Sequence, residues 1–277
     1  MRPGPDPRLR RALALAPALC LVVLLVGAGL AGAVRASLGV TRRAGWGAAD
    51  LDAYRRLASD PLFWEALRFT LQTAALATAV SVVLALALAA PLRRAGTTGR
   101  VLAAVPVAVP HLVAAVLAVA WIGPGGLADR LVGGLPVDLV RDPLGFGVVL
   151  VYVVKETPFL ALLVLAVWTP AVAAREEAAA VLGASPAQRL AWVVWPALRG
   201  PLVTGAAIVA AFVVGALEVP RVVGPTGART LAEYAVDATR TAGVEGRATA
   251  NAALLVATAI ALVLAGVAAA TLRGRHA

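Results

Sequence analysis

Residues 174–201 read AREEAAAVLGASPAQRLAWVVWPALRGP, a polar stretch between two long apolar segments. The residues before Gly183 are rich in Ala, Glu and Leu, which favour helix, and Gly183 stands where a helix would end in a left-handed residue. Ser185, followed by Pro186 and Gln188, forms a capping-box pattern for a second helix. The stretch therefore predicts two short helices joined by a rigid turn.

The second of these helices should be short. We expect it to run from about Pro186 to Trp195, because Pro196 and Pro201 follow directly. A proline inside a helix removes a backbone N–H donor and its ring crowds the preceding turn. The two prolines are therefore expected to interrupt the chain before the next apolar run begins.

The composition is that of a membrane protein, with 61% hydrophobic residues, 14% charged residues and a mean hydropathy of +0.87. The apolar runs lack period-two alternation, which favours helices over strands. A helix needs roughly 20 residues to cross a hydrocarbon core of ~30 Å. Runs near that length occur at residues 12–34, 69–91, 101–123, 147–169, 202–219 and 250–272. The sequence therefore predicts an all-α integral membrane protein with about six transmembrane helices, the third interrupted by Pro106 and Pro110.

Arginine is distributed unevenly between the two ends of these spans, and short cytoplasmic segments usually carry the positive charge. The segments expected on one side hold Arg2, Arg8, Arg10, Arg11, Arg93, Arg94, Arg100, Arg273 and Arg275. With six spans the stretch 174–201 lies on that side too. The first loop on the other side is also basic, but it contains Asp and Glu as well. We therefore expect both termini to be cytoplasmic.

The spacing within residues 174–201 carries a resemblance to a known family. Glu177, Ala178 and Ala179, then three residues, Gly183, and Pro196 thirteen positions later resemble the cytoplasmic signature loop of ABC-importer permeases. The resemblance implies the type I permease architecture, in which a short coupling helix fits into a cleft on an ATP-hydrolysing subunit. The alternative is an amphipathic surface helix with no special role.

On this resemblance the coupling helix is residues 185–195. Val193 and Trp195 stand where the family more often has Ile and Leu, and both remain apolar. The residues expected to serve ATPase coupling are Glu177, Ala178, Ala179, Gly183, Ser185, Pro186, Val193 and Pro196.

The resemblance also implies partners. The chain would be one permease subunit of a binding-protein-dependent importer in the bacterial cell membrane, forming half of a solute pathway. ATP and Mg²⁺ would bind to partner ATPase subunits, and this chain itself would hold no cofactor. A second permease chain, in a heterodimer or a homodimer, and an extracytoplasmic solute-binding protein complete the set. The segment LEVPRVVGPTGARTLAEYAV, residues 217–236, looks most like the polyamine, iron(III) and thiamine branches.

The expected organisation has three parts. Residues 1–66 hold the N-terminal tail, the first span and an outer loop, residues 67–272 form the permease core with its coupling loop at 171–200, and residues 273–277 form a cytoplasmic tail. The first span could instead be a cleaved signal peptide, since it has a basic start and small residues near its end. Its apolar length favours a retained helix.

Lys155 and Glu156 fall near the middle of the fourth apolar run, where ionisable groups are costly to hold in lipid. Neighbouring helical residues point about 100° apart, so each needs its own partner or both flank a polar seam. They either line the solute pathway, together with Glu218 after the fifth span, or only fix helix packing.

Enzymatic chemistry finds no support in the sequence. Cys20 is the only cysteine, and His111 and His276 are the only histidines. The sequence shows no Ser-His-Asp set, no phosphate-binding Gly-rich loop with Lys and no metal-ligand spacing, so we expect a non-catalytic subunit without catalytic or metal residues. The charge of +10 is scattered among loops, which favours contact with membrane lipid over nucleic acid.

Two competing functions stay open at this point. One is an ATP-independent carrier or channel that uses Lys155 and Glu156. The other is an intramembrane enzyme, for which the sequence offers no constellation of residues.

Overall fold

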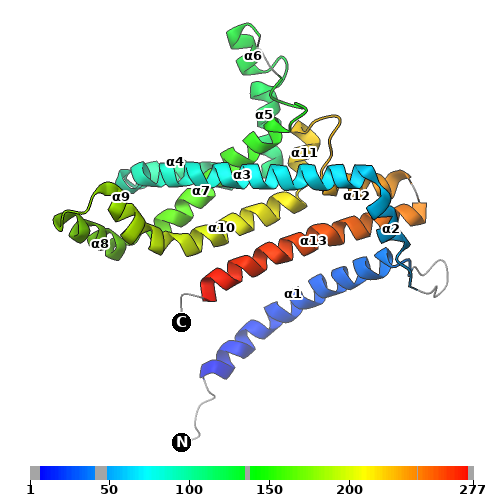
Figure 1. Cartoon of the computed structure of the whole chain (residues 1–277), viewed down its shortest axis with the longest axis horizontal. Coiled ribbons are helices and arrows are strands. Elements are labelled where there is room, and N and C mark those ends of the chain that lie inside the picture. Colours follow the sequence, from blue (N-terminus) through cyan, green and yellow to red (C-terminus); the bar gives the residue numbers. More distant parts are fainter. Residues whose placement is uncertain (1–6, 41–48, 135–137, 242, 274–277) are drawn as a thin grey trace, which may run out of the picture. The chain divides into compact units, whose positions relative to one another are not determined.

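The computed structural model describes residues 7–40, 49–134, 138–241 and 243–273, and every regular element within them is a helix (Figure 1). Six helices are long and apolar enough to cross a membrane: Leu13–Ser37, Pro61–Arg94, His111–Val132, Phe146–Val167, Pro186–Gly215 and Glu245–Thr271. The predicted all-α class and the number of spans are therefore confirmed, and the chain is built as a multi-pass membrane protein.

The third and fifth spans differ most from their predicted bounds. The run at 101–123 is divided into α4 (Thr97–Ala108) and α5 (His111–Ile122), with Val109 and Pro110 in extended conformation between them. The fifth span begins at Pro186 instead of residue 202. Both differences involve prolines. The helix is interrupted at Pro110, whereas it continues through Pro196 and Pro201.

The prediction that Pro196 and Pro201 interrupt the chain is wrong. Helix α9 (Pro186–Arg189), the π-helix η2 (Leu190–Val194) and α10 (Trp195–Gly215) follow one another without a break. In η2 the N–H of Trp195 reaches back to the carbonyl of Leu190, one residue further than in an α-helix. Such a widened turn makes room for the ring of Pro196, so the helix absorbs the proline without ending.

The chain forms two compact units. The first comprises residues 1–60 and 235–255, with α1 (Pro7–Ser37), α2 (Asp52–Ser59), the end of α12 (Leu231–Thr241) and the start of α13 (Gly243–Arg273). Within it the hydroxyls of Ser37 and Tyr54 lie 2.9 Å apart, and Arg56 Nε donates to Thr249 Oγ1 over 3.4 Å. These contacts join α2 to the end of α1 and to the start of α13.

The second unit comprises residues 61–234 and 256–277 and is built on three long helices: α3 (Pro61–Arg94), α7 (Phe146–Val167) and α10. Helix α7 packs on α3, α4, α5 and α10 and is the most buried of the six spans (Figure 1). Small residues let helices approach closely in a membrane. Most buried positions of α3 follow this rule, the exceptions being Phe63, Phe69 and Leu92. The small buried residues are Ala66, Thr70, Thr73, Ala74, Ala77, Ser81, Ala85 and Ala89.

Helix α10 approaches α7 in the same way, at Gly205. A Cβ added there would lie 2.5 Å from the Leu163 side chain and 2.9 Å from that of Leu160. A side chain at position 205 would therefore force the leucine side chains of α7 to shift, and glycine lets α10 pack on α7 without that shift.

The remaining elements of this unit are α6 (Leu127–Val132), α8 (Pro170–Val181) and α11 (Glu218–Val223). Helices α8 and α9 lie at the C-terminal end of α3, where α4 begins, whereas α5 and α11 lie towards the N-terminal half of α3 (Figure 1). The predicted coupling loop and the segment around Glu218 are thereby placed in different regions of the same unit.

Candidate functional site

The predicted coupling loop begins where α8 ends, and this end has the geometry of a Schellman motif. Gly183 has φ +87°, in the left-handed region. Its N–H donates to the carbonyl of Ala180 over 3.0 Å, and the N–H of Ala184 donates to that of Ala179 over 2.9 Å. The predicted left-handed glycine is confirmed, and these two bonds fix the direction in which the chain leaves α8.

The next helix begins with the predicted capping box, which the structure confirms. Ser185 Oγ accepts from the N–H of Gln188 over 3.3 Å, and the N–H of Ser185 donates to Gln188 Oε1 over 2.8 Å. Pro186 occupies the first turn, where its missing N–H costs nothing. Both ends of the turn at 182–185 are thus held by their own hydrogen bonds, which favours the rigid loop predicted from the sequence.

Large apolar side chains are exposed on this loop in spite of its polar surroundings. Val181 is 88% exposed, Leu182 is 87% exposed and Trp192 is 69% exposed. Leu190 and Trp195 are exposed as well, while Val193 is half-buried and Val194 is buried. A rigid loop that presents several large apolar residues has the character of a protein-docking surface. We call residues 181, 182, 190, 192 and 195 the docking surface.

The two glutamates of α8 differ in their surroundings. Glu177 is exposed. Glu176 is half-buried, and its Oε2 lies 3.2 Å from Nη1 of Arg93 at the end of α3. The sequence singled out Glu177 but gave no sign of this ion pair, because the two partners are 83 residues apart.

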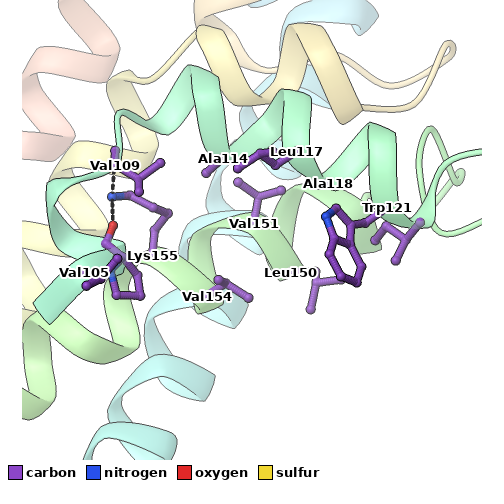
Figure 2. A pocket seen from close by; sticks show the side chains of 12 residues that line it. Val105, Val109, Ala114, Leu117, Ala118, Trp121, Leu150, Val151, Val154 and Lys155 are labelled. Carbon is purple, nitrogen blue, oxygen red and sulfur yellow. Dashed lines mark hydrogen bonds between the residues drawn. The ribbon is translucent and has the colours of Figure 1, made fainter. Parts of the chain in front are cut away.

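A second group of polar residues surrounds the break between α4 and α5. The ammonium of Lys155 on α7 donates hydrogen bonds to the carbonyls of Pro106 and Val109 (Figure 2). It also donates to the carbonyl of Val107 over 3.3 Å. Lys155 is only 4% exposed. An ammonium has three donors, and here each of them meets a carbonyl that the helix break leaves without its usual partner.

Glu156, the next residue of α7, braces the other side of the break. Its Oε1 lies 2.8 Å from Nε2 of His111, the first residue of α5. The His111 ring also packs against Phe212, with ring centroids 4.4 Å apart. Glu156 therefore ties the start of α5 to α7 as Lys155 ties the end of α4.

The charges of these two residues suit the helix ends they meet. The C-terminus of a helix carries partial negative charge and the N-terminus partial positive charge. Lys155 sits at the C-terminus of α4, and Glu156 contacts the first residue of α5. The predicted separate partners for Lys155 and Glu156 are confirmed by these contacts, and a role in the solute pathway stays a prediction.

Two cavities adjoin the break. The first, of about 460 Å³, lies between α4, α5 and α7 and is lined almost entirely by apolar residues, with Trp121 near one end and Lys155 at the other (Figure 2). The second, of about 240 Å³, is lined by His111, Glu156, Phe159 and Phe212 among others. Lys155 belongs to the lining of both, so the break separates two hollows within the spans.

Glu218, the third predicted pathway residue, begins α11 and is exposed. Helix α11 packs against α5 and α7, which carry His111 and Glu156. A third cavity, of about 580 Å³, lies near the start of α3 and is lined by Glu65, Arg68, Gln72, Arg141 and the segment 225–228. The polar segment after α11 thus borders a polar cavity at the end of α3 opposite to Arg93.

Solved structures with the same arrangement of helices come from ABC transporters. A chain of a bacterial alginate ABC transporter, in complex with an alginate pentasaccharide-bound periplasmic protein, matches with a TM-score of 0.70, 18% identity and coverage of 94% of each chain. A chain of a bacterial ABC transporter involved in the import of the acidic polysaccharide alginate matches with a TM-score of 0.70 and 18% identity over 96% of this chain and 97% of that one.

The chain shares the fold of these ABC importers. No protein-family model and no curated protein sequence matches it. The architecture predicted from the spacing around Gly183 is therefore confirmed at the level of the fold.

Replacing Gly183 tests the orientation of the docking surface. A Cβ at Gly183 meets no atom within 4 Å, so Gly183→Val acts only through its left-handed backbone, which costs a non-glycine residue about 1–2 kcal/mol. On the coupling role that the sequence predicts for this loop, Gly183→Val should reach the membrane yet lose most ATP-dependent uptake. Gly183→Asn should keep most of it, because asparagine tolerates this conformation. Equal uptake by both variants, measured in intact cells, would contradict a role for the turn.

Replacing Lys155 tests the brace at the helix break. Lys155→Met removes the ammonium from three carbonyls. Pro106 still accepts the N–H of Val109 over 3.3 Å, whereas Val107 and Val109 lose this donor, and each unsatisfied buried group costs on the order of 1–3 kcal/mol. We expect a clear fall in the temperature at which the detergent-extracted protein aggregates, and a smaller fall for Lys155→Arg. The neighbouring exposed residue provides the control, since Val154→Met removes no hydrogen bond. A Lys155→Met protein as heat-stable as Val154→Met would show that the carbonyls need no donor.

Proposed function

We propose that this chain is a permease subunit of a binding-protein-dependent ABC importer, forming half of a solute pathway and coupling it to ATP hydrolysis by a partner subunit. The observation that carries the proposal is the docking surface. An ABC-importer fold presents, on a loop with the spacing of the family's signature, a rigid turn with Leu182 and Trp192 exposed. Such a surface fits an apolar cleft on an ATPase.

The helix that follows the loop supports a coupling role. Residues 186–215 form one continuous helix of 30 residues, so residues 190, 192 and 195 of the docking surface belong to the same helix as the fifth span. A push on residues 190–195 is then carried directly into the packing of α10 against α7 and α3. A flexible connection at Pro196 would have absorbed that push.

The partners follow from this function. ATP and Mg²⁺ bind to the ATPase subunits, and this chain is a non-catalytic translocation subunit without a cofactor of its own. A second permease, in a heterodimer rather than a homodimer, completes the pathway, and an extracytoplasmic protein delivers the solute near the polar cavity lined by Arg68 and Arg141. Both termini and the docking surface face the cytoplasm of a bacterial cell. Residues 217–236 favour a branch related to polyamine, iron(III) or thiamine import.

The ATP-independent carrier is the competing function. It requires a titratable ion-coupling site, for which Glu156 is the candidate, since it borders the cavity of about 240 Å³. It leaves the exposed apolar side chains of the docking surface without a role, which is why we favour the importer.

The docking surface is tested by copurification. We expect a tagged chain, gently extracted from its native membrane, to bring with it an ATPase and a second permease, identified by mass spectrometry. Leu182→Asp should lose the ATPase, because a carboxylate replaces a residue that is 87% exposed and apolar. Leu131→Asp on α6, where the leucine is 74% exposed, is the matched control and should retain the ATPase.

Two results would count against the proposal. Recovery of the wild-type chain without any ATPase would favour the ATP-independent carrier. Retention of the ATPase by Leu182→Asp to the same extent as by Leu131→Asp would remove the docking role from this loop.

Glu156 offers a test of the solute pathway. Glu156→Gln keeps a hydrogen-bonding group opposite His111, so we expect the protein to insert and fold normally. Uptake of the solute recognised by the copurified binding protein should nevertheless be abolished, because the charge that faces the cavity is gone. Normal uptake by this variant would remove Glu156 from the pathway and leave it the bracing role alone.

A further inference from the structure

A cluster of three side chains lies at the C-terminal end of α3, outside the docking surface. It consists of Arg93, Trp168 and Glu176, and we call it the clasp. Arg93 Nη1 lies 3.2 Å from Glu176 Oε2, and the Arg93 guanidinium carbon lies 4.0 Å from the centroid of the Trp168 ring. The ring distance is within the range of a cation–π contact. One arginine therefore holds two other elements at once.

The two residues held by Arg93 flank the corner between α7 and α8. Trp168 directly follows α7, and Glu176 lies in the middle of α8. The end of α3 is thereby attached both to the last span before the docking surface and to the helix that leads into it.

An apolar cluster continues the clasp towards the spans. It contains Ala89 of α3, Val164 of α7, Val194 of η2, and Leu198 and Leu202 of α10, all nearly fully buried, with Trp168 packed against it. The clasp therefore lies on the cluster where α3, α7 and the continuous helix 186–215 meet.

The neighbouring glutamates Glu176 and Glu177 face different surroundings. Successive residues of a helix point about 100° apart, so the two carboxylates cannot serve the same partner. Glu176 is bound to Arg93 within the chain, whereas Glu177 is exposed and available to another protein.

We propose that Arg93 is a positioning residue that ties α8 to α3 through Glu176 and Trp168, so that movement of the docking surface is transmitted to α3. Glu177, in contrast, serves the contact with the ATPase. This proposal rests on the proposed function and adds to it the link by which α3 is coupled. Because the ion pair is partly exposed, its contribution to stability is small, and variants of it should still fold.

The test follows the far end of α3 with a chemical probe and needs no knowledge of the solute. In a Cys20→Ser background, Gln72→Cys places a thiol on α3 beside the cavity of about 580 Å³. The purified complex, with its copurified ATPase, is labelled with a charged maleimide without nucleotide and after trapping with ATP and vanadate. We expect the labelling rate to differ by at least about fivefold, the lower end of typical coupling between two sites.

The variants then separate the clasp from the docking contact. Arg93→Gln and Glu176→Ala should keep the ATPase bound but bring the ratio of labelling rates close to one. The exchanged pair, Arg93→Glu with Glu176→Arg, should restore part of the ratio, and Arg93→Lys should keep part of it, since lysine retains the charge but not the planar stacking on Trp168. Arg94→Gln, at the exposed neighbouring position, should leave the ratio unchanged. Glu177→Ala should instead lose the ATPase.

The outcomes distinguish the two proposals. Absence of an ATPase from the wild-type complex would overturn the proposed function. An ATPase-bound complex in which Arg93→Gln responds to nucleotide as the wild type does would overturn the clasp alone. The clasp would also be overturned if the Gln72→Cys thiol, with Arg93 and Glu176 unchanged, were labelled at the same rate with and without nucleotide, because α3 would then not move.

Discussion

Backbone groups inside a membrane must be hydrogen-bonded within the protein, and the arrangement of α4, α5 and α7 depends on this constraint. A membrane interior offers no water to the carbonyls that a broken helix exposes. The apolar run predicted as the third span, residues 101–123, is broken at Val109 and Pro110. Lys155 donates to carbonyls at the break, while Glu156 holds His111 at the start of α5. Two charged side chains in the middle of a span are therefore explained by the break they face. The direction of α5 and the cavities beside it depend on this brace.

The third and fifth spans show how proline can have opposite consequences in a membrane helix. At Pro110 the chain leaves the helical conformation, and the freed groups are met by a neighbouring helix. At Pro196 the π-turn widens the helix locally and the backbone continues. The run at 101–123 is thereby divided into two helices, whereas residues 186–215 form a single helix that carries residues 190, 192 and 195 of the docking surface.

Much of the candidate coupling loop could be predicted from local sequence. The left-handed Gly183 and the capping box of Ser185 and Gln188 are formed by residues within a few positions of one another, so the local sequence predicts both. The partners of Lys155 and the pair of Arg93 with Glu176 lie dozens of residues apart, and no local pattern indicates them. For the partners of Lys155, the available signal in the sequence was the pair of prolines at 106 and 110, together with a lysine in the following apolar run.

The sequence by itself determined what depends on composition and short-range chemistry: a helical membrane protein with six spans, and a rigid polar loop with a left-handed turn. Only the tertiary structure decided which side of each helix is buried, whether a proline ends or merely widens a helix, and which of two adjacent glutamates is already paired. The physical reason is that these features depend on groups brought together by packing. Glu176 and Glu177 have the same side chain, and the position of Arg93 on α3 is what gives them different surroundings.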